Sequence, residues 1–109
     1  KGGGIFNNGG TVTLEQSEVR NNVAGESGGG IHNEPSGVVT LVDSRVSGNE
    51  AGIRGGGIAN YGALALRNTV VQENQGGGLY NFGSVTLDGT SRVVRNVPFN
   101  CQGTAACSP

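Results

Sequence analysis

The amino-acid sequence contains a glycine-led segment that occurs four times. Three consecutive glycines followed by an aliphatic residue begin at Gly2, Gly28, Gly55 and Gly76, at intervals of 26, 27 and 21 residues. Repeats of roughly 20 to 30 residues are typical of solenoid proteins, in which each unit buries its apolar face only against its neighbours. This periodicity limits the possible folds more than any other feature of the chain.

Four aliphatic positions recur at fixed places in each repeat. One follows the glycines, two alternate shortly afterwards, and a valine comes after them. The sets are Ile5, Ile31, Ile58 and Leu79; Val12, Val39, Leu64 and Val85; Leu14, Leu41, Leu66 and Leu87; and Val19, Val46, Val71 and Val93. Alternation with a spacing of two predicts short strands that bury one face, and glycine recurs too often for helices. We expect three such strands per repeat.

Two asparagine positions recur in step with the aliphatic ones. The first set is Asn7, Asn33, Asn60 and Asn81, and the second set is Asn22, Asn49, Asn74 and Asn96. A buried asparagine side chain can donate a hydrogen bond to one neighbour and accept one from another. If each repeat forms one turn of a coil, equivalent residues stack about 4.8 Å apart, and the asparagines form two ladders.

These patterns predict an all-β chain folded as a right-handed parallel β-helix, a solenoid of about four coils with three short strands per coil. The repeats span residues 1–97, with coils starting near residues 2, 28, 55 and 76, and residues 98–109 form a C-terminal cap. The first glycine of each triplet is placed to adopt a positive φ. The middle glycine is predicted to point inward at a crowded corner.

The glycine triplets, together with "VRNN", "VSGN", "VQEN" and "VVRN", resemble the glycine-rich repeats of bacterial surface β-helix proteins, within the broad pectin-lyase-like class of right-handed β-helices. They are similar to the GGA(I/L/V) and FxxN repeats of chlamydial polymorphic outer membrane proteins, although glycine replaces the alanine and valine replaces the phenylalanine. The resemblance covers residues 2–97. It implies a secreted or cell-surface protein that acts in adhesion or as a scaffold.

The two cysteines, Cys101 and Cys107, both lie in the last nine residues. Their CxxxxxC spacing lacks the further ligands of a zinc site, so we favour a disulfide that closes the cap over a redox or metal pair. A disulfide indicates a secreted, periplasmic or cell-surface location. The N-terminal coil has no comparable cap, which suggests missing upstream coils, a protein partner or self-association at this edge.

No outward column of the predicted coils combines two acids with a base. We therefore expect no enzyme activity, and we assign no catalytic residue, metal ligand or cofactor. Glu15 and Asp88 lie three coils apart, about 14 Å by the coil spacing, which is too far to act together on a glycosidic bond. His32 is expected to be an ordinary surface residue. The net charge of −1 and the lack of a long apolar run argue against a nucleic-acid partner and a membrane-spanning segment.

These features favour a non-catalytic scaffold, adhesive module or accessory subunit of a larger assembly. Insertions lengthen the same corner after Asn22 and Asn49, and such paired insertions often form the contact face of repeat proteins. The predicted contact loops contain Val23, Ala24, Glu26, Glu50, Ile53 and Arg54.

Two alternative functions remain open. One is a glycan-binding or glycan-lyase-like fragment of a longer β-helix, with a surface that uses the aromatic residues Phe6, Tyr61, Tyr80 and Phe82. The other is an ice-binding protein, because outward threonines such as Thr13, Thr40 and Thr86 make a partial array on one flat sheet. Ala63 and Ala65 interrupt that array, and threonine is in any case common on the solvent face of strands.

Overall fold

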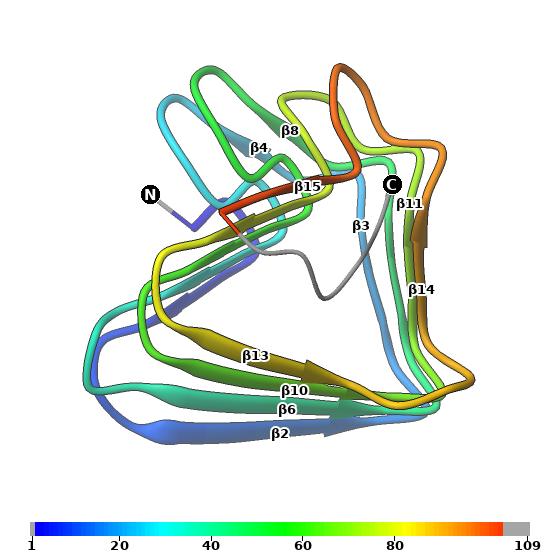
Figure 1. The fold of residues 1–109 in the computed structure, drawn as a ribbon. Helices are drawn as coiled ribbons and strands as arrows, with labels where there is room; N and C mark the ends of the chain where they lie inside the picture. Colours follow the sequence, from blue (N-terminus) through cyan, green and yellow to red (C-terminus); the bar gives the residue numbers. More distant parts are fainter. Residues whose placement is uncertain (1, 104–109) are drawn as a thin grey trace.

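The computed structural model describes residues 2–103, and these residues form an all-β parallel solenoid of about four coils (Figure 1). No helix occurs within this part of the chain. The coil is consistent with the right-handed sense that parallel crossover connections favour. The predicted fold class is therefore confirmed.

Equivalent strands of successive coils stack into four parallel sheets. Sheet A consists of β1 (Ile5–Asn7), β5 (Ile31–Asn33), β9 (Ile58–Asn60), β12 (Leu79–Asn81) and β15 (Cys101–Gln102). Sheet B consists of β2 (Thr11–Glu15), β6 (Val38–Val42), β10 (Ala63–Arg67) and β13 (Ser84–Leu87). Sheet C consists of β3 (Glu18–Arg20), β7 (Arg45–Ser47), β11 (Val70–Gln72) and β14 (Arg92–Val94). Sheet D pairs β4 (Val23–Ala24) with β8 (Glu50–Ala51).

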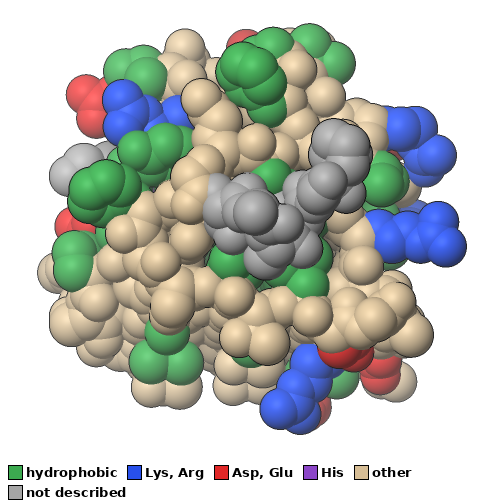
Figure 2. Space-filling view, in the orientation of Figure 1, with side chains coloured by type: hydrophobic (Ala, Val, Ile, Leu, Met, Phe, Trp, Pro, Cys, Tyr) green, Lys and Arg blue, Asp and Glu red, His purple; other side chains and the backbone are tan. Residues whose placement is uncertain are grey.

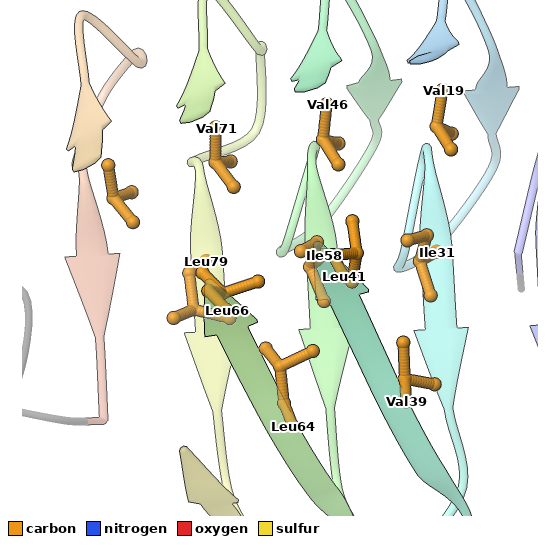
Figure 3. Packing of buried hydrophobic residues seen from close by; sticks show 11 residues of the cluster. Val19, Ile31, Val39, Leu41, Val46, Ile58, Leu64, Leu66, Val71 and Leu79 are labelled. Carbon is orange, nitrogen blue, oxygen red and sulfur yellow. The ribbon is translucent and has the colours of Figure 1, made fainter. Parts of the chain in front are cut away.

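The predicted aliphatic columns are confirmed by the register of the strands. Ile31 pairs with Ile5 and Ile58, and the other three sets pair in the same way along sheets B and C. Their side chains pack together inside the coil (Figure 3). Leu41 and Leu66 are fully buried, whereas Leu14 and Leu87 at the two ends of the same column are only partly buried. The core is a continuous apolar column that is better covered in its middle than at its ends.

Both predicted asparagine ladders are present. In the first ladder, the Nδ2 of Asn7, Asn33 and Asn60 donates to the Oδ1 of the next asparagine at 2.9, 2.9 and 2.8 Å. In the second, Asn22, Asn49 and Asn74 donate in the same direction at 3.0, 3.0 and 2.8 Å. The amides also donate to backbone carbonyls at the corners, for example Asn49 to Val19 at 2.9 Å. Within residues 2–103, every buried side-chain nitrogen and oxygen atom has a hydrogen-bond partner.

A third ladder, made of hydroxyl groups, was not predicted. The backbone N–H of Ser17, Ser44 and Thr69 donates to the hydroxyl oxygen of the next coil, at 3.2, 3.4 and 3.1 Å. The hydroxyl of Ser44, and likewise that of Thr69, donates back to the carbonyl two residues earlier at 2.8 Å. Threonine replaces serine at one of the four positions, so the ladder is less visible in the sequence than the asparagine ladders.

The glycine triplets allow successive coils to approach closely. The first glycine of each triplet has a positive φ, between 62° and 91°, as predicted. The crowding predicted at the middle glycine is confirmed for Gly29. A Cβ built on Gly29 lies 2.3 Å from the carbonyl oxygen of Gly56 and 2.4 Å from that of Glu50, so the backbone of the neighbouring segments, and not the apolar core, excludes a side chain.

Two further segments depart from the predicted three strands per coil. The corner insertions are partly ordered as sheet D, in which Ala24 and Ala51 are buried. Beyond coil four, β15 pairs with β12 and adds a fifth strand to sheet A, so Cys101 extends the column of Ile58 and Leu79. Cys107 and the end of the predicted cap lie outside the described residues, and the Cys101–Cys107 disulfide remains a prediction.

Candidate functional site

A cleft of about 400 Å³ lies where the inserted corner meets sheet A. Two of its walls come from the segments after β4 and β8, and the others come from β5 and from the turns after β5 and β9. It is lined by Glu26, Ser27, His32, Glu34, Ile53, Arg54 and Tyr61. Three of the predicted contact-loop residues, Glu26, Ile53 and Arg54, are therefore brought together with groups that the sequence did not connect to them.

His32 is buried, with only 2% of its surface exposed, so the prediction of a surface residue is wrong. Its Nδ1 lies 3.1 Å from the Ser27 hydroxyl oxygen, and its Nε2 lies 3.0 Å from Oε1 of Glu34. The sequence-based assignment treated this position of sheet A as facing solvent. The inserted corner, which carries Ser27, covers the outer face of β5 and buries the ring.

A row of rings runs across the coils beside the cleft. The centroid of His32 lies 5.4 Å from that of Phe6 and 5.2 Å from that of Tyr61. Tyr61 in turn lies 5.8 Å from Tyr80 and 6.1 Å from Phe82. The aromatic residues suggested by the sequence are therefore brought together, and His32 joins them in the same row.

Arg54 is held at the edge of the cleft by Tyr80 of the next coil. Its guanidinium carbon lies 4.8 Å from the centroid of the Tyr80 ring, and its Nη1 donates to the Tyr80 hydroxyl at 3.3 Å. The stacking and the hydrogen bond together restrict a side chain that is otherwise flexible. The remaining N–H groups of Arg54 are available to an acceptor in the cleft.

The other predicted contact-loop residues divide between exposed and buried positions. Val23 and Ile53 have 68% and 61% of their surface exposed, Glu50 is exposed on β8, and Ala24 is buried between the coils. Sequence reasoning missed Ser27, Glu34 and Tyr61 as companions of His32. One feature of the sequence could have indicated that His32 is special. His32 is the only polar, titratable imidazole at a position where the other coils have Phe6, Ala59 and Tyr80.

A second polar group lies at the corner between sheets B and C, where Asp88 accepts hydrogen bonds from the Ser91 and Thr90 hydroxyls and from the backbone N–H of Asn68. The hydrogen bond from the Ser91 hydroxyl is the main reason that the pKa of Asp88 lies below its usual range. The carboxylate is exposed, and its partners lie in its own turn and at the same corner of the preceding coil, so this group stabilises the corner.

The outer face of sheet B has the register expected for the threonine array. Thr13, Thr40 and Thr86 occupy one row, and Ala65 interrupts the row between Thr40 and Thr86. Figure 2 shows basic and acidic side chains in small separate groups on the face that it presents. That distribution is unlike the continuous basic stripe that binds nucleic acids.

Within residues 2–103, no three His, Cys, Asp or Glu side chains are grouped closely enough to hold a metal ion. The same residues contain no helix with the length and hydropathy needed to cross a bilayer. Comparison with protein-family models, with curated proteins and with solved structures finds no match to this chain.

Proposed function

We propose that this chain is a β-helix scaffold that acts as an adhesive module or accessory subunit by presenting its inserted corner to a protein partner. The observation that carries the proposal is the exposure of Val23 and Ile53, two aliphatic side chains at the same corner. Exposed apolar groups beside a polar cleft are typical of the centre of a contact surface. The rigid stack of coils supplies a fixed platform, which lowers the entropy lost on binding.

A photocrosslinking experiment tests this proposal. A photoreactive amino acid is placed at Ile53 in one variant and at Thr86, on the exposed face of sheet B, in a control variant. Each variant is incubated with surface extract of the native source and irradiated. A defined protein adduct that forms from position 53 and is absent from position 86 supports the proposal. Equal adducts from both positions, or none, contradict it.

A second candidate function, glycan binding, is favoured by the row of rings from Phe6 to Tyr80. Aromatic faces stack on sugar rings, and carboxylates such as Glu26 and Glu34 can accept hydrogen bonds from hydroxyl groups. A glycan array distinguishes the two candidates. Binding on the array that is lost in Tyr61→Leu but kept in Ile53→Glu favours the glycan, and an array on which the unmodified chain binds no glycan favours the protein partner.

We also propose a secreted, periplasmic or cell-surface location in a bacterium. The proposal rests on the predicted Cys101–Cys107 disulfide, since such bonds form and persist in oxidising compartments. Intact mass measured with and without a reductant tests it. Reduction of a disulfide adds two hydrogen atoms. A mass that increases by this amount supports the location, and an unchanged mass contradicts it.

A further inference from the structure

We propose that Ser27 is a nucleophile and that the cleft hydrolyses small carboxylic esters. This activity goes beyond the scaffold function and does not depend on it. It also reverses, for this one site, the expectation from sequence that the chain is not an enzyme. The inference rests on the arrangement of Ser27, His32 and Glu34, which the strand register brings together.

The three side chains form a connected nucleophile, base and orienting acid. The Ser27 hydroxyl lies 3.1 Å from Nδ1 of His32, and Oε1 of Glu34 lies 3.0 Å from Nε2. When Nε2–H donates to Glu34, the lone pair of Nδ1 faces Ser27 and accepts the hydroxyl proton. The same arrangement of side chains activates the serine of acyl-transfer enzymes. Here Nδ1 faces the serine and Nε2 faces the acid, which is the reverse of the usual assignment.

The imidazole is held in one orientation before any substrate arrives. His32 is almost completely buried, and its ring lies between those of Phe6 and Tyr61 with centroid distances of 5.4 and 5.2 Å. Ser27 and Glu34, at opposite ends of the ring, both line the cleft. A base that cannot rotate away from its nucleophile is preorganised for proton transfer.

The fold itself does not require these three residues. At the position of His32 the neighbouring coils have Phe6 and Ala59, and the bridge partner of Ser27 on the next coil is Arg54. The inward positions of sheets A, B and C repeat the same residue type, whereas outward positions vary from coil to coil, as where Glu18 pairs with Arg45. Ser27, His32 and Glu34 occupy variable positions where the first coil passes into the second, and all three line one cleft.

Arg54 is placed to stabilise negative charge on the reacting carbonyl oxygen. It is the bridge partner of Ser27, so the two residues lie on adjacent coils in register, and both line the cleft. The Tyr80 hydroxyl and ring restrain the guanidinium, which keeps further N–H donors for an oxyanion. Fixed donors of this kind supply much of the catalysis in acyl transfer.

The reaction follows from these positions. Ser27 Oγ attacks the ester carbonyl carbon while its proton passes to Nδ1 of His32, and Glu34 stabilises the imidazolium that forms. The tetrahedral intermediate collapses when the bond to the alcohol oxygen breaks, and the departing alcohol takes the proton from Nδ1. Water then attacks the acyl-serine in the same way, which releases the carboxylic acid and restores the Ser27 hydroxyl. The cleft volume of about 400 Å³ is large enough for a small ester.

Covalent labelling gives the most direct test. An alkyl fluorophosphonate forms a bond from Ser27 Oγ to phosphorus and releases fluoride, while His32 takes the proton. The full chain is treated with this reagent, and intact mass and peptide mapping locate the adduct. We expect one adduct, on Ser27, and no adduct in Ser27→Ala. Ser36→Ala, which removes an exposed turn hydroxyl, is the control and should label like the unmodified chain.

Turnover of p-nitrophenyl acetate provides the second test. We expect hydrolysis above the buffer rate that is abolished in Ser27→Ala and lowered on the order of 100-fold in kcat in Glu34→Gln, which keeps an oxygen acceptor but removes the charge. Peptide mapping of the unmodified chain stays informative even if Ser27→Ala fails to fold. The proposal is overturned if the unmodified chain takes no label, if the label lies on another residue, or if hydrolysis equals the buffer rate.

Discussion

At the scale of single residues, the asparagines of the second ladder decide whether one coil can be stacked on the next. Asn49 is fully buried. Its amide donates to Val19 and Asn74, and its oxygen accepts from the backbone and the side chain of Asn22. Val19 and Asn74 are buried and Asn22 is half-buried, so the loss of the Asn49 side chain leaves several partners unsatisfied.

Asn49→Ala should therefore be strongly destabilising. Each buried polar group left without a partner costs about 1–3 kcal/mol, and we expect the free energy of unfolding to fall by about 3 kcal/mol or more. Urea unfolding measures this change. Asn8→Ala, at an exposed position beside the first ladder, is the matched control and should lie within about 0.5 kcal/mol of the unmodified chain. Similar losses for the two variants would show that the ladder is not a source of stability.

Asp88 predicts a dependence of stability on pH. Its folded pKa is lowered, chiefly by the Ser91 hydroxyl, so folding favours the ionised carboxylate. The resulting stability is present above the unfolded pKa, near 3.8, and is lost as the pH falls through the lower folded value. We expect Asp88→Asn to be less stable than the unmodified chain at pH 7, with the difference disappearing in acid. Thermal unfolding between pH 7 and pH 2 measures it, with Glu15→Gln as the control, and a difference that persists at pH 2 would contradict this origin.

At the scale of elements, successive coils approach each other closely at the glycine segments before sheet A. Gly29→Ala places a Cβ within 2.4 Å of two backbone carbonyl oxygens, which cannot move without displacing the neighbouring coils. Gly25→Ala, in the same corner, places its Cβ in open space. Circular dichroism during heating should show loss of the cooperative transition for Gly29→Ala. Gly25→Ala should unfold at the same temperature or slightly higher, because alanine restricts the unfolded chain. Equal transitions for both would contradict the steric role of the triplet.

Some of these elements could be predicted from the sequence, and others could not. The strands of sheets A, B and C follow from repetition, because stacking selects the same residue type in every coil. Sheet D could not be predicted in this way, since it pairs two-residue segments, such as Val23–Ala24, that occur in only two coils. His32 was placed wrongly for a related reason. Its burial depends on how the inserted corner folds back over sheet A. The repeat pattern of the sequence gives no information about the conformation of that corner.

At the scale of the whole molecule, each coil is stabilised mainly by the coils on either side, so stability should vary along the axis. Val39 and Leu41 of β6 and Leu66 of β10 are fully buried, whereas the inward residues of β2 and β13 are only partly covered. The outer edge of β2 pairs with no other strand within residues 2–103. This edge is also the surface through which self-association was predicted.

Amide hydrogen exchange measured at two protein concentrations tests both consequences. At the lower concentration we expect the slowest exchange in β6 and β10, because opening them requires separation from two neighbours, and faster exchange in β2 and β13. Equal rates in all four strands would mean that the solenoid opens only as a single unit. If copies stack through the first coil, raising the concentration should slow exchange in β2 and leave β6 unchanged. A β2 rate that does not change with concentration would argue against this edge as the contact and in favour of the inserted corner, where Val23 and Ile53 are exposed.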